Sequence, residues 1–144
     1  MQRTRAFGTY WCGAVVRIVG PMAPLIQYHA TVLGSPDPRA AARFYSTLLG
    51  WELGDDEQEW TTVRDPAGGR QLSFQFEENY ERPVWPEQPG KQQQMMHLDL
   101  LVADLAKAAA HAEDCGATKA PHQPQEDVIV FFDPDGHPFC LFEN

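Results

Sequence analysis

The 144-residue sequence predicts an α+β fold made of two βαβββ units, which form a curved, mostly antiparallel mixed sheet around a cup with the helices outside. The first observation is that the order strand, helix, three strands occurs twice along the chain. The second is that landmarks recur at a nearly constant spacing. The helix caps Asp37 and Asp104 are 67 residues apart, the helix ends Gly50 and Gly116 are 66 apart, and two DPxG turns begin 68 apart, at positions 65 and 133.

The first unit is predicted to span residues 25–77. Leu25–Leu33 is rich in β-branched and aromatic residues, which favours a strand, and Asp37-Pro38 is typical of a helix N-terminus. Apolar residues at positions 41, 44, 45, 48 and 49 form one stripe of the helix, which Gly50 ends. Three short strands follow, at residues 51–53, 60–63 and 71–76, with predicted turns between them at residues 54–58 and 65–69.

The second unit is predicted to span residues 95–144, after a linker at 78–94 that is rich in Pro and Gln and has no periodicity. Residues 95–102 favour a strand, Asp104 caps a helix that ends at Gly116, and strands follow at 117–120, 128–132 and 138–142.

The first strand of the second unit alternates in character. Leu98 and Leu100 are apolar, whereas His97 and Asp99 are polar. Because side chains alternate across a strand, the leucines are predicted to face the helix and the polar pair to face the cup. In the first unit, Ser73 and Gln75 share a face in the same way.

Composition excludes several classes of protein. The chain has 11 Lys and Arg against 20 Asp and Glu, a formal net charge of −9, which argues against binding to nucleic acid or to an anionic membrane. No apolar run is long enough to span a bilayer. Three scattered cysteines without a C-x-x-C pair do not make a disulfide framework, so we expect a cytoplasmic protein. Residues 1–24 lack the repeat pattern and are predicted to be a dispensable N-terminal extension.

Three segments resemble a known family: DPRAAARFYSTLLGWEL in the first helix, MMHLDLLVADL at the start of the second unit and DPDGHPFCLFEN at the end. They are similar to the vicinal oxygen chelate superfamily, which includes glyoxalase I, bleomycin-resistance proteins, fosfomycin-resistance enzymes and extradiol dioxygenases, and within it to the glyoxalase-like domains. The resemblance covers residues 25–144 and implies a homodimer.

Metal-dependent members of that superfamily place a His or Gln on the first strand of each unit and a Glu on its last strand. His97 matches one of these four positions, but Ala30, Ser73 and Cys140 stand at the other three. His29 lies beside Ala30 and, without a bulge, faces the other way. We therefore expect no bound metal and no other cofactor. If a divalent metal binds, His97 is its expected ligand, and Cys140 also suits zinc.

The resulting prediction is a domain that binds a small organic molecule in a cup between the two units, with no complete metal site. The residues expected on the cup wall are His97, Asp99, Ser73, Gln75 and Cys140. His97 beside Asp99 suits a metal ligand, a general base or a hydrogen-bonding wall residue, and Cys140 also suits a small buried apolar position. No catalytic residue is assigned.

Three alternatives stay open at this point. One is a metal-dependent lyase, isomerase or dioxygenase, and another is a drug-sequestering resistance protein of the bleomycin-resistance type, for which the negative charge favours a cationic guest. The third is an interaction domain whose cup is collapsed. The expected partners are the small-molecule ligand and a second copy of the chain.

Overall fold

The computed structural model describes residues 25–144, so the predicted extension at 1–24 lies outside the described residues. The described chain forms two helices and eight strands, in this order: β1 (Thr31–Ser35), α1 (Pro38–Leu49), β2 (Glu52–Asp56), β3 (Trp60–Arg64), β4 (Gln71–Phe76), β5 (Leu98–Leu101), α2 (Leu105–Cys115), β6 (Thr118–Lys119), β7 (Val128–Phe132) and β8 (Pro138–Phe142).

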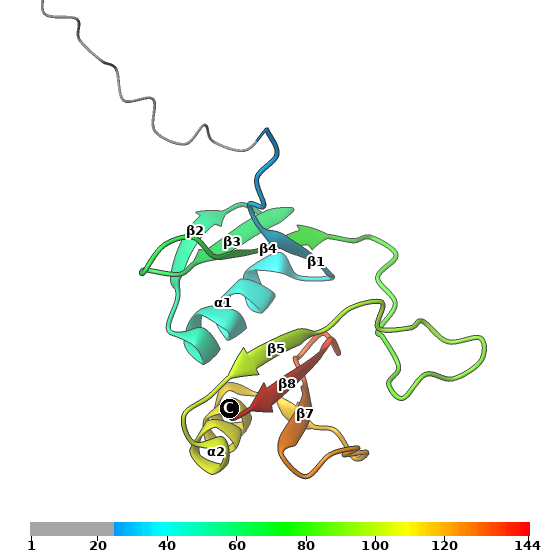
Figure 1. Cartoon of the computed structure of the whole chain (residues 1–144). Helices are drawn as coiled ribbons and strands as arrows, with labels where there is room; N and C mark the ends of the chain where they lie inside the picture. The colour runs from blue at the N-terminus through cyan, green and yellow to red at the C-terminus, as the bar shows by residue number, and fades with distance from the viewer. Residues whose placement is uncertain (1–24) are drawn as a thin grey trace, which may run out of the picture.

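The strands form two four-stranded sheets, ordered β1-β4-β3-β2 and β5-β8-β7-β6 (Figure 1). In each sheet the first strand of the unit pairs in parallel with the last, and the remaining pairs are antiparallel. The predicted α+β class and its two βαβββ units are therefore confirmed.

The repeated caps hold both helices in the predicted places. Asp37 accepts a hydrogen bond from the Ala40 amide at 3.0 Å, and Asp104 accepts one from the Lys107 amide at the same distance. Both helices end at a glycine in the left-handed region, with φ of 66° at Gly50. A carboxylate that accepts an orphan amide at the N-terminus, with a glycine at the other end, is a strong local signal.

The helices lie between the two sheets, whereas we expected them outside (Figure 1). A single core joins both helices to one face of each sheet. On α1, the Tyr45 ring stacks on Phe74 of the first sheet at 5.4 Å, and the Phe44 ring lies 6.3 Å from Phe139 of the second. The apolar stripe of α1 is thus wide enough to cover both sheets. As a result, one chain does not close a cup between its two units.

The turn between β7 and β8 ties the units together. Asp133, only 2% exposed, accepts a hydrogen bond from the Tyr45 hydroxyl at 2.9 Å. The same carboxylate lies 2.8 Å from Nδ1 of His137. Ser35 donates to Asp135 at 2.6 Å across 100 positions of sequence. Burial first, and then the Asp133 carboxylate, raises the pKa of Tyr45, so its hydroxyl stays a donor.

Several strand boundaries differ from the predicted ones. β1 begins at Thr31, which pairs with Leu72, the second residue of β4, so residues 25–29 lie beyond the start of that partner strand. The apolar side chains Leu25 and Ile26 are consequently exposed. β2 continues to Asp56, through a predicted turn. Within residues 25–144, neither helix has the length and apolar character needed to cross a membrane.

Candidate functional site

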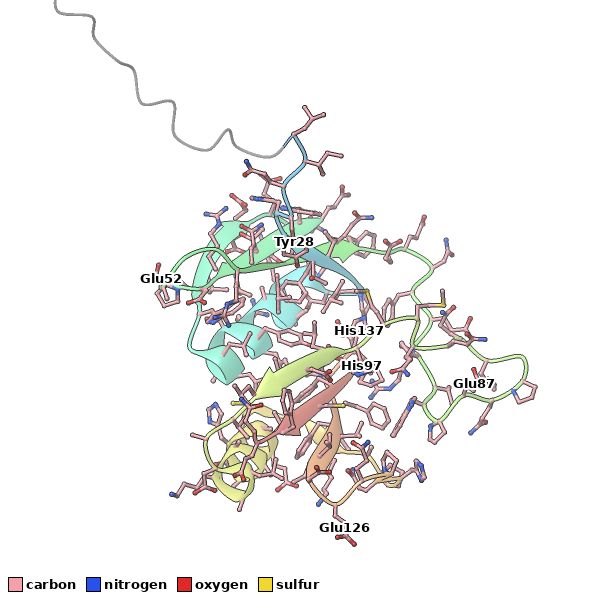
Figure 2. All side chains as sticks on the ribbon, in the orientation of Figure 1. Tyr28, Glu52, Glu87, His97, Glu126 and His137 are labelled. Carbon is pink, nitrogen blue, oxygen red and sulfur yellow. The ribbon has the colours of Figure 1, made fainter. Side chains whose placement is uncertain are left out.

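Each sheet has an outer face, opposite the helix layer. On the second unit, Leu98 pairs with the buried Phe139 and packs toward the core, while Asp99 pairs with Cys140 on the outer face. His97 precedes β5 on the same side, as the alternation predicts, with Nε2 3.2 Å from Oδ1 of Asp99. The structure therefore brings three of the five predicted site residues together, with His97 and Asp99 exposed and Cys140 partly exposed. Figure 2 labels His97 on the second unit.

Burial and the Asp99 carboxylate set the chemistry of Cys140. Burial is the larger cause that raises the pKa of this thiol, and the negative charge and hydrogen bond of Asp99 raise it further. The thiol is thus protonated at neutral pH and can donate weakly to Asp99. A thiolate nucleophile needs the opposite surroundings, so the geometry argues against nucleophilic catalysis by Cys140.

The rest of this outer face is apolar. Val130 pairs with Cys140, and Phe132 pairs with Pro138, so these side chains continue the surface away from β5. The linker adds Trp85, whose ring centre lies 6.4 Å from that of Phe132. The outer face of the second unit therefore has a polar edge along β5 and an aromatic side toward β7.

The other two predicted residues lie on the outer face of the first unit. Ser73 is fully buried there and accepts a hydrogen bond from Nε2 of Gln71 at 3.0 Å, which occupies its hydroxyl. Gln75 is exposed and donates to Oε1 of Glu77 at 3.0 Å. In this arrangement Gln75 is open to a ligand, whereas Ser73 supports the side chain beside it.

Sequence reasoning missed a polar network on the same face. Arg64 donates to Asp55 at 3.0 Å and to Oε1 of Gln71 at 3.0 Å, while the Thr62 hydroxyl lies 3.2 Å from Asp55. Arg64 and Gln71 flank the DPAGG turn, and residues that flank a hairpin turn face each other, so this spacing was an available signal. Sequence reasoning did not place Asp55 on this strand face, because its segment was predicted to be a turn.

The two halves of the predicted site are thus on different sheets, with the helix layer between them. His97, Asp99 and Cys140 belong to one outer face, and Gln75 to the other. A single chain does not bring all five residues into one cup. His29, the other first-strand histidine, is exposed and precedes β1.

The superfamily's four-ligand metal arrangement does not fit these residues. Ala30 has no ligand atom, and the buried Ser73 hydroxyl accepts a hydrogen bond from Gln71. The second unit alone offers one nitrogen, one oxygen and one sulfur from His97, Asp99 and Cys140, all within 4.8 Å of one another. That donor set is one that zinc accepts.

Comparisons with known proteins agree with this fold. A family model described as a glyoxalase-like domain matches residues 30–142. The uncharacterized protein YaeR of Escherichia coli (strain K12) is 29% identical over 131 residues, which cover 85% of this chain and 100% of YaeR.

Several solved structures share the architecture. The glyoxalase family protein from Enterococcus faecalis superimposes with a TM-score of 0.61 at 22% identity, covering 83% of this chain and 98% of that one. The fosfomycin resistance protein FosX from Mesorhizobium loti gives a TM-score of 0.59 at 16% identity, covering 82% and 92%. Because the family model matches residues 30–142, which are most of the chain, this chain belongs to the glyoxalase-like domain family.

Proposed function

We propose that this protein binds a small organic molecule on the outer face of the second unit, in a cup that a second copy of the chain completes. The observation on which this rests is the exposed cluster of His97, Asp99 and Cys140 beside an aromatic surface. Polar side chains that converge beside apolar walls are typical of small-molecule sites. Gln75 of the second copy supplies the facing wall.

The edges of the two sheets support a homodimer. β1 and β5 are the edge strands at corresponding ends of their sheets, and an edge strand has unpaired backbone groups. Val32 on β1 is 44% exposed and Leu101 on β5 is 57% exposed, so each edge strand carries an exposed apolar side chain. Pairing of β1 with β5 of a second copy would cover both and place the two outer faces on one curved surface.

The site favours a ligand with a hydrogen-bond donor at one end and an apolar body. The exposed Asp99 carboxylate accepts hydrogen bonds, while the partly exposed Phe132 offers apolar contact. We assign no reaction to the site, since no described side chain of the cluster is an activated nucleophile. The free thiols of Cys115 and Cys140 agree with the reducing cytoplasm that we propose as its location.

One observation favours a second candidate, a site for a divalent metal ion such as zinc. His97, Asp99 and Cys140 would hold the ion on a single unit, without residues of the other sheet. A bound ion of this kind supplies Lewis acidity to a ligand oxygen. This candidate differs from the first in one measurable quantity, the metal content of the purified protein.

Thermal-shift screening tests the proposal directly. The full chain, purified without chelator and analysed for metal, is screened against small carbonyl compounds and organic amines. A ligand stabilises by about 2.7 kcal/mol at 100 times its Kd, so hits give a concentration-dependent rise in the thermal midpoint. His97→Ala is expected to abolish the rise, whereas His29→Ala, which changes another exposed histidine, should preserve it.

Light scattering tests whether the chain forms the proposed dimer in solution. The full chain should have the mass of a dimer, and Leu101→Asp should yield a monomer that no longer responds to the hits. Leu53→Asp is the matched control, because Leu53 is 54% exposed on β2, at the opposite edge of the first sheet. Hits that stabilise His97→Ala as well as the wild type would refute the proposed site. Stoichiometric metal that is lost in His97→Ala would favour the second candidate.

A further inference from the structure

Hydrogen bonds to the second unit hold the linker between the units in place. The Tyr80 hydroxyl donates to the carbonyl of Asp135 at 2.9 Å, and Arg82 donates to the carbonyl of Pro134 at 2.7 Å. Gly136 makes this contact possible, because a Cβ there would lie 2.5 Å from Cγ of Arg82. The linker is therefore anchored to the β7–β8 turn just before Trp85.

Beyond this anchor the linker closes into a loop that surrounds a cavity. The amide of Val84 donates to the carbonyl of Gln92 at 2.8 Å, which joins the two arms of the loop. The cavity has a volume of about 390 Å³ and is lined by Val84, Trp85, Pro86, Glu87, Gln93, Gln94 and Met95. A volume of this size accommodates a small ligand. Figure 2 shows the loop with Glu87 standing clear of both units.

The Trp85 ring is held in place from the second unit. Its centre lies 6.4 Å from the Phe132 ring at an interplanar angle of 68°, and 5.6 Å from the His122 ring at 48°. Trp85 is half-buried between these neighbours and the cavity. An indole fixed in this way needs no reorganisation to receive a ligand, which reduces the entropic cost of binding.

The charge of the residues that line this cavity indicates the charge of the ligand that it favours. Glu87 is the only charged residue among the seven that line the cavity, and Lys91 of the same loop is not one of them. The remaining lining is indole, amide, thioether and aliphatic. An indole face attracts cations, and a nearby carboxylate adds to the attraction and repels an anion.

We propose that this loop is a binding site for an organic ammonium ion, held against Trp85 and paired with Glu87. The site shares Trp85 with the aromatic side of the outer face but uses no residue of the cluster at His97, and it does not depend on the function proposed for that cluster. The alkyl groups of the ion would contact Met95, which lines the cavity and is 80% exposed.

A matched pair of probes tests this site. Choline carries a trimethylammonium group, and 3,3-dimethylbutan-1-ol has the same shape without the charge. Each is titrated into the full chain labelled with ¹⁵N, and the indole N–H signals of the tryptophans are followed by NMR. We expect choline to shift the Trp85 signal and to bind at least about fivefold more tightly than the alcohol, which is the range of a partly desolvated cation–π contact.

Variants locate the site on the loop. Trp85→Leu should abolish choline binding, and Trp85→Phe should retain it in weakened form. Glu87→Gln should weaken it several-fold, whereas Glu126→Gln, an exposed carboxylate on another loop, should leave it unchanged. His97→Ala should also leave it unchanged, which separates this test from that of the proposed function. Three results would overturn the proposal. The first is equal affinity for the two probes, and the second is no binding of choline at about 50 mM, a very weak affinity. The third is wild-type affinity in both Trp85→Leu and Glu87→Gln.

Discussion

Removing one hydroxyl group, by Tyr45→Phe, tests how the two units are held together. The Tyr45 ring is 1% exposed and packs between Phe44 and Phe74, contacts that phenylalanine retains. What the variant loses is the 2.9 Å hydrogen bond to Asp133, a carboxylate that is itself 2% exposed. The change therefore isolates one polar link between α1 and the β7–β8 turn.

The expected cost follows from the partner's charge and burial. Hydrogen bonds to charged groups contribute about 1.5–3 kcal/mol, and the upper part of that range applies where the charged partner is left in the interior. Asp133 keeps the amide and Nδ1 of His137 as partners, which limits the loss. For a domain of this size the midpoint of thermal unfolding should fall by roughly 5–10 °C.

Urea unfolding of the full chain, followed by circular dichroism, measures this cost. Tyr28→Phe is the control, because Tyr28 is exposed and its hydroxyl makes an exposed 2.6 Å hydrogen bond with Oγ1 of Thr31. The control should change the free energy of unfolding by less than about 0.5 kcal/mol. If the two variants cost the same, the buried link contributes nothing to docking and the reasoning is refuted.

Three further predictions concern the site and its surroundings. Leu98→Ala should lower the free energy of unfolding by about 2 kcal/mol, because Leu98 packs against the core, whereas His97→Ala should change it by less than about 0.5 kcal/mol. Asp99→Asn should lower the pKa of Cys140 by removing a negative charge, so iodoacetamide should alkylate that thiol faster at pH 8. Burial raises the pKa of Asp135, so ionising this group opposes folding, and Asp135→Asn should stabilise the chain more at pH 7 than at pH 4.

Each of these has a clear contrary result. A larger loss of stability in His97→Ala than in Leu98→Ala would mean that the strand faces the other way. Peptide mapping by mass spectrometry isolates the alkylation of Cys140, and an unchanged or slower rate in Asp99→Asn would refute the electrostatic account. For Asp135 the direction of the pH dependence decides. Because its pKa is raised in the folded state, protonation of Asp135 favours folding. The cost of ionising Asp135 is therefore absent at low pH and grows as the pH rises through the folded pKa. A variant whose advantage grows toward pH 4 would contradict it.

Local signals predicted the elements well. The helix caps Asp37 and Asp104 and the terminal glycines lie where predicted, because capping depends on residues within one turn of each other. The alternation around Leu98 placed His97 and Asp99 on the outer face for a similarly local reason. The start of β1 was missed because a strand ends where its partner ends, and the partner β4 lies far along the chain.

The packing of the units was not predictable from such signals. Both a cup within one chain and helices between the sheets bury the same apolar stripe of α1, and only contacts between distant residues decide between them. Phe44 against Phe139 and Tyr45 against Asp133 are those contacts. The same holds for Ser73 and Gln75. They point to the predicted face of their strand, but they do not lie near His97, because His97 belongs to the other sheet.

A crystal structure of the full chain with a compound from the thermal-shift screen tests the central claim most directly. We predict two copies, with the compound in contact with His97 and Asp99 of one chain and with the outer face of the first unit, around Gln75, of the other. A compound bound by a single chain away from His97, or a dimer that leaves both outer faces uncovered, would contradict the claim.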